Sequence, residues 1–185
     1  MLEKLKKSVR ECPVVEIEDY HYFIHPLSDG LPLVEQELMH EVVQAVKERA
    51  DLECDYILTA QSMGFPLAAA LSMETGLPYK FIRKRKYGLD GEIAISQTTG
   101  YSENEMYLNF VEKEDKVFLI DDVLSTGGTL KSIIKTLQDL DVDICDVMVV
   151  FEKVGTKKSL EEELGVKIKS LLKVKMEGSE VKIVD

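Results

Sequence analysis

The chain has 185 residues, a formal net charge of −11 and a sequence pI near 4.8. This length suits a single domain that buries roughly 70% of its unfolded surface. The acidic balance argues against a nucleic-acid or membrane-surface partner, although a local basic patch could still bind a small anion. The cysteines are odd in number and widely spaced, which disfavours a disulfide framework or a zinc site. Without an apolar run of ~18 residues or a signal-peptide core, we expect a cytoplasmic protein.

The N-terminal part is predicted to be aromatic and irregular before the first long helix. Residues 1–10 form an amphipathic pattern that predicts a short packing helix. Residues 14–17 and 20–24 predict short strands, broken at His25-Pro26 and again at Ser28-Asp29-Gly30. Residues 33–50 predict a helix, because apolar residues recur with its period at Leu38, Val42, Val43 and Val46. The dispersed histidines are more typical of surface or packing positions than of ligands.

Two further strands each end in a segment of interest. Residues 54–59 (CDYILT) predict a buried strand, residues 60–64 a turn and residues 65–74 a helix, which taken alone could be an ordinary sheet corner. Residues 79–82 predict the next strand, and the basic run Arg83-Lys84-Arg85-Lys86 follows it directly. A charge run is usually a solvated face, but four cations at a strand end also suit a ligand with several negative charges.

A polar, glycine-punctuated stretch follows at residues 87–105. The alternating pieces 92–96 and 106–110 flank it, so the residues alone predict a surface hairpin.

Residues 117–129, VFLIDDVLSTGGT, carry the strongest functional pattern. The unbroken apolar run at 117–120 predicts a strand buried on both faces of a parallel sheet, with Asp121 and Asp122 at its carboxyl end. Ligands of open α/β sheets bind at that end. The following loop has two glycines that allow close approach to a bound group, and a helix begins after it, which is typical of a phosphate site. The two carboxylates would then take sugar hydroxyls or a hydrated Mg²⁺.

The rest of the chain completes an α/β pattern. Apolar residues after the loop recur with helical spacing, and residues 144–151 predict another buried strand that ends in Phe151-Glu152-Lys153. Residues 159–164 predict a helix, and residues 166–176 and 181–184 predict strands that cover a sheet edge.

The 117–129 motif resembles the phosphoribosyl-pyrophosphate (PRPP) signature of type I phosphoribosyltransferases. The resemblance implies an α/β fold with a central, mostly parallel sheet, helices on both faces, a small hood and a flexible lid loop. It implies one domain over residues 1–185, with the hood formed by about 1–32 and the C-terminal strands and the lid by about 86–105. It also implies that Asp121 and Asp122 are catalytic and hold the ribose hydroxyls, and that the 5′-phosphate is bound by Ser125, Thr126, Gly127, Gly128 and Thr129.

The same resemblance implies which residues bind the pyrophosphate. In the family, the loop that matches residues 60–64 wraps the pyrophosphate with backbone amides, sometimes through a strained non-proline peptide. The predicted pyrophosphate residues are therefore Ala60, Gln61, Ser62, Met63 and Gly64, joined by Arg83 and Lys84 from the basic run. In the family this basic segment acts partly across a dimer interface, which implies a homodimer, and the lid closes over the site and excludes water.

The overall arrangement resembles the adenine and xanthine branch of the purine enzymes and, most closely, archaeal-type hypoxanthine/guanine phosphoribosyltransferases. In the xanthine enzymes a Glu-Lys pair ends the strand after the signature helix, and its lysine binds the purine 6-oxygen. Lys153, with Phe151, is therefore the predicted base-binding residue, and a lysine has only donors, which favours a 6-oxo group. Ile24 stands where the xanthine pattern has an asparagine, which disfavours xanthine.

The implied reaction joins hypoxanthine or guanine to the ribose of PRPP, with Mg²⁺ bound mainly through the substrate and Asp121 and Asp122 as further possible ligands. Many hypoxanthine-guanine enzymes have an aspartate where this chain has Ser125, so no general base is assigned there. Two alternatives stay open: an adenine phosphoribosyltransferase, and a non-catalytic regulator that senses PRPP.

Overall fold

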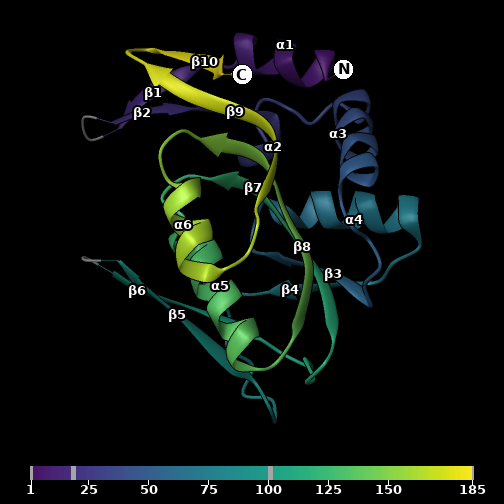
Figure 1. Cartoon of the computed structure of the whole chain (residues 1–185). Coiled ribbons are helices and arrows are strands. Elements are labelled where there is room, and N and C mark those ends of the chain that lie inside the picture. Colours follow the sequence, from purple (N-terminus) through teal and green to yellow (C-terminus); the bar gives the residue numbers. More distant parts are fainter. Residues whose placement is uncertain (1, 18–19, 100–101, 185) are drawn as a thin grey trace.

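The computed structural model describes residues 2–17, 20–99 and 102–184. Its centre is a six-stranded sheet in the order β10-β9-β8-β7-β3-β4, in which every neighbouring pair is parallel except β9 and β10 (Figure 1). The strands are β3 (Tyr56–Ala60), β4 (Tyr79–Ile82), β7 (Lys116–Leu124), β8 (Asp143–Lys153), β9 (Lys169–Glu177) and β10 (Glu180–Val184). The predicted mostly parallel sheet is confirmed.

Helices cover both faces of this sheet, because the central strands are apolar on both sides. Along β7, Phe118 and Ile120 belong to one buried cluster, whereas Val117 and Leu119 belong to the other. The first cluster includes buried residues of α3 (Gln36–Arg49) and α4 (Gly64–Thr75), and the second includes those of α5 (Gly128–Asp139) and α6 (Lys157–Leu164). None of the helices in the described part of the chain has the length and apolar character that a bilayer crossing needs.

Smaller elements flank the sheet. At one end of the molecule lie α1 (Glu3–Glu11), the hairpin of β1 (Val14–Ile17) and β2 (Tyr20–Phe23), and β10 (Figure 1). The short helix α2 (Pro26–Asp29) packs beside β7. A second hairpin, β5 (Ile93–Thr99) with β6 (Ser102–Leu108), stands apart from this end and contacts α5. The hairpin predicted at residues 92–110 is confirmed; hood and lid behaviour stay predictions.

Two local predictions differ from the structure. Residues 26–29 form a helical turn, since proline suits a helix start, the His25 side chain accepts a hydrogen bond from Leu27 N and Gly30 ends the turn at φ 71°. Four residues are too few to show helical periodicity. The strand predicted at 117–120 continues to Leu124, because the long strand β8 still offers partners there: Val123 pairs with Phe151 and Leu124 with Glu152.

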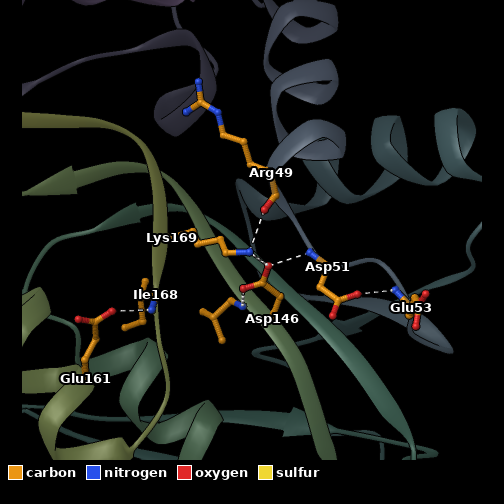
Figure 2. A network of polar contacts seen from close by, with 8 residues as sticks. Arg49, Asp51, Glu53, Asp146, Glu161, Ile168 and Lys169 are labelled. Atoms are coloured by element: carbon orange, nitrogen blue, oxygen red, sulfur yellow. Dashed lines mark hydrogen bonds and ion pairs between the residues drawn. The ribbon is translucent and has the colours of Figure 1, made fainter.

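A buried polar network fixes the end of the sheet away from the carboxyl ends of the parallel strands (Figure 2). Asp146, near the start of β8, accepts hydrogen bonds from Lys169 Nζ (2.6 Å), Asp51 N (2.8 Å) and Val147 N (2.9 Å). Lys169 Nζ also donates to Arg49 O at 2.8 Å. The network therefore connects β8, β9 and the chain after α3 through one carboxylate that is almost fully buried.

Candidate active site

The acid pair lies near the carboxyl end of β7, as predicted, but within the strand. Asp122 N donates a hydrogen bond to Asp121 Oδ1 at 3.0 Å. Burial raises the pKa of Asp121, and burial together with the neighbouring Asp121 raises the pKa of Asp122. Hydrogen-bond donors or a cation would stabilise the charged forms of two carboxylates held this way. Sugar hydroxyls and a hydrated metal ion are both suitable.

The predicted phosphate loop joins β7 to α5, and the helix begins at Gly128. Gly127 precedes the helix at φ 79°, a conformation that favours glycine. A Cβ there would also lie 3.0 Å from Leu160 Cδ2 and 3.1 Å from Thr156 Cγ2, so α6 packs against the back of the loop. A small cavity of about 80 Å³ is lined by Asp121 and by the whole loop from Ser125 to Thr129. This places Asp121 and the N-terminus of α5 around the same space, and a helix N-terminus favours an anionic group.

The predicted pyrophosphate loop joins β3 to α4. Ala60 is the last residue of β3 and is buried, whereas Gln61 and Ser62 are exposed and joined by a cis peptide. Gly64 opens α4 where a Cβ would overlap the Thr59 hydroxyl and lie 3.5 Å from Asp121 Oδ1. The loop therefore approaches the acid pair closely, and only glycine fits this position.

The basic run is hydrogen-bonded to the predicted pyrophosphate loop, although the two segments are separated along the chain. Gln61 N donates to Ile82 O at 2.9 Å, and Lys84 N donates to Gln61 Oε1 at 3.0 Å. Arg83 and Tyr107 exchange two backbone hydrogen bonds, of 2.9 and 2.6 Å, which connects the run to the β5–β6 hairpin. The structure thus brings together the loop, Arg83, Lys84 and the base of the predicted lid.

Lys153 ends β8 beside an aromatic pair from the N-terminal hairpin. Its Nζ lies 5.0 Å from the centroid of the Tyr22 ring and 5.3 Å from that of Phe23. A cavity of about 220 Å³ lies here, lined by Phe23, Lys153, Val154, Val174, Lys175 and Met176. Sequence reasoning missed Tyr22 and Phe23, for which the dense aromatic run YHYF was the available signal.

Phe151, also predicted to bind the base, is fully buried. Its ring packs edge-on against Phe23 (5.7 Å between centroids) and against His25 (4.7 Å). Side chains alternate along a strand, so Phe151, two residues before Lys153 on β8, projects from the same face of the sheet. Its position indicates support for the aromatic pair, and direct base contact stays a prediction.

The carboxylates suit a metal ion that is bound largely by its substrate. Within the described ranges, no group of three or more His, Cys, Asp or Glu side chains is arranged to hold a metal ion. Mg²⁺ usually keeps several waters and binds through one or two carboxylates plus substrate phosphates. Asp121 and Asp122 fit that donor set.

Comparisons with known proteins show which family the chain belongs to. Residues 31–182 match the phosphoribosyl transferase domain family. The chain is 50% identical to a hypoxanthine/guanine phosphoribosyltransferase of Methanocella paludicola over 99% of this chain and 95% of that protein. It is 47% identical to the protein of that name from Methanothermus fervidus, over 100% of this chain and 98% of that one.

Solved structures show the same fold at lower sequence identity. The adenine phosphoribosyltransferase of Thermoanaerobacter pseudethanolicus superposes with a TM-score of 0.77 at 20% identity, covering 94% of this chain and 99% of that one. The Saccharomyces cerevisiae adenine phosphoribosyltransferase gives a TM-score of 0.74 at 18% identity, covering 92% of this chain and 98% of that one. The matched domain, the archaeal relatives and the shared fold together show that the chain belongs to the phosphoribosyl transferase domain family.

Proposed function

We propose that the protein is a purine-salvage glycosyltransferase that joins hypoxanthine, guanine or both to the ribose of PRPP and releases pyrophosphate. The observation that carries this proposal is the acid pair beside a glycine loop and helix N-terminus at the carboxyl end of β7. Relatives that match nearly the whole chain bear the name hypoxanthine/guanine phosphoribosyltransferase, which supports the choice of base.

In this proposal the chain mainly positions and stabilises the substrate. Asp121 and Asp122 accept hydrogen bonds from the ribose 2′- and 3′-hydroxyls and favour the positive charge that develops on the sugar. The loop from Ser125 to Thr129 donates backbone hydrogen bonds to the 5′-phosphate. The loop at 60–64 holds the leaving pyrophosphate together with Arg83 and Lys84. Asp121 and Asp122 would hold Mg²⁺ together with the substrate, and the ion would neutralise charge on the leaving group.

The base is assigned to the cavity next to Lys153. The ammonium group donates hydrogen bonds and accepts none, so it suits the 6-oxygen of hypoxanthine or guanine and offers nothing to the 6-amino group of adenine. Tyr22 borders the same lysine and is half-buried, so its ring offers apolar surface to a flat base, whereas Phe23 lines the cavity but is almost fully buried. The adenine phosphoribosyltransferases among the solved structures share the fold, and adenine is the alternative base.

The hairpin at about 86–105 serves as the lid in this proposal, and the enzyme acts as a homodimer in the cytoplasm. Strand β4, at the edge of the six-stranded sheet, supports a dimer. Tyr79 on this strand and the nearby Phe110 are exposed, Phe110 at 71%, and a second copy of the chain would cover them. Light scattering tests the dimer directly, and a strictly monomeric active enzyme would contradict it.

The experiment that tests the function is a steady-state assay with PRPP, Mg²⁺ and each of hypoxanthine, guanine, xanthine and adenine. The variants are Lys153→Met and, as a matched control, Lys175→Met, since Lys175 lines the same cavity but is exposed and paired with Glu177 at 3.2 Å. Loss of a charged hydrogen bond of about 1.5–3 kcal/mol should lower kcat/KM for 6-oxopurines roughly 10- to 150-fold in Lys153→Met. Lys175→Met should behave as the native protein.

The possible outcomes separate the alternatives. Turnover of adenine alone would contradict the role of Lys153. No turnover of any base, with PRPP still bound, would place the protein in the sensor class.

A further inference from the structure

The hydroxyl of Thr59 is a buried polar group that forms no hydrogen bond within the described fold. Thr59 is fully buried on β3. In the part of the chain that the structure describes, its Oγ1 has no hydrogen-bond partner. An unpaired buried hydroxyl is costly, and valine has almost the same shape and suits a strand better. A threonine at this position therefore calls for a hydrogen-bond partner.

The surroundings of Thr59 indicate which group that partner is. A Cβ placed on Gly64 would overlap Thr59 Oγ1 and lie 3.5 Å from Asp121 Oδ1. The hydroxyl and the carboxylate therefore approach the same point beside the first residue of α4. Asp121 Oδ1 already accepts a hydrogen bond from Asp122 N, and a carboxylate can accept several more. The added Cβ would lie 1.8 Å from Thr59 Oγ1 and 3.5 Å from Asp121 Oδ1, so the two oxygens are at most 5.3 Å apart, the sum of these two distances.

We propose that Thr59 is a positioning residue for Asp121: its hydroxyl donates a hydrogen bond to the carboxylate when PRPP is bound and holds it against the ribose. The inference rests on the proposed function, because it deepens the role of Asp121 in binding the sugar. It also explains why glycine opens α4, since any side chain at position 64 would occupy the space between the two groups.

The test uses two matched pairs that differ mainly by the hydroxyl: native protein against Thr59→Val, and Thr59→Ser against Thr59→Ala. We expect each variant without the hydroxyl to lose about tenfold in kcat/KM for PRPP relative to its partner, as the loss of a hydrogen bond to a charged group predicts. Thermal unfolding should show Thr59→Val at least as stable as the native protein. A packing role alone would instead lower stability and spare the kinetics.

Calorimetric titration with PRPP and Mg²⁺ in the absence of base gives a second readout. Weaker PRPP binding in Thr59→Val and Thr59→Ala, with near-native binding in Thr59→Ser, supports the inference even if the native protein turns over no purine. Equal kinetics and affinity within each pair would overturn it, as would a loss in Thr59→Ser as large as that in Thr59→Ala. If Thr59→Val does not fold, the Ser and Ala pair decides.

Discussion

Replacement of Gly64 by alanine tests the close approach between the predicted pyrophosphate loop and β3. The new methyl would overlap the Thr59 hydroxyl and lie 3.1 Å from Thr59 Cβ, and Thr59 is fully buried and cannot swing aside. Overpacking of this kind costs about 1–3 kcal/mol. Alanine regains part of this through its higher helix propensity, by less than ~1 kcal/mol. We expect a net loss of about 2 kcal/mol in the free energy of unfolding.

For a chain of 185 residues this loss lowers the Tm by roughly 4–8 °C. It should also raise the KM for PRPP, since the loop must move away from β3 to make room. Differential scanning calorimetry and steady-state kinetics measure the two effects.

A double-mutant cycle identifies the cause of the loss. Thr59→Ala removes the overlapping hydroxyl, so Gly64→Ala should cost less in that background by about 1–2 kcal/mol. Gly76→Ala is the control at the other end of α4: its φ is 78° and nothing lies within 4 Å of an added Cβ. That variant should lose ~1 kcal/mol from backbone conformation alone and show no coupling to Thr59→Ala. Native stability of Gly64→Ala, or strict additivity in the cycle, would refute the steric argument.

Two further predictions concern the polar groups that hold the fold. Lys169→Met leaves the Asp146 carboxylate buried without its cation, so the free energy of unfolding measured in urea should fall by about 1–3 kcal/mol while kcat stays unchanged. The control is Lys167→Met, which should be neutral because the Lys167 side chain is 88% exposed. Equal stability of the two variants would contradict the role of the network. Burial lowers the pKa of His25 from 6.5 to about 4. As the pH falls, His25 is therefore protonated in the unfolded chain before it is protonated in the folded protein. The free energy of unfolding, to which neutral His25 contributes fully above about pH 6.5, falls by on the order of 3 kcal/mol as the pH drops towards 4. His25→Asn retains an acceptor for Leu27 N and should lose this part of the pH slope; an unchanged slope would rule out His25 as its source.

The sequence alone was sufficient to predict the strand–loop–helix unit that carries the acid pair, because its signals are local. A buried strand, two carboxylates, two glycines and a helix follow one another within residues 117–129, and each leaves its own signature in residue type or period. The mostly parallel sheet was predictable for the same reason, since continuous apolar strands alternate with helical segments. The family resemblance supplied the roles.

Only the tertiary structure decided which distant residues meet at the site. Lys84 bonds Gln61, the Gly64 position meets Thr59 and Asp121, and Lys153 lies beside Tyr22 and Phe23 from the other end of the chain. It also placed Phe151 in the core, although Phe151 lies only two residues before Lys153 in the sequence. The physical reason is that strand order and packing bring these groups together, and nothing in the local pattern of one segment specifies which other segment will lie against it.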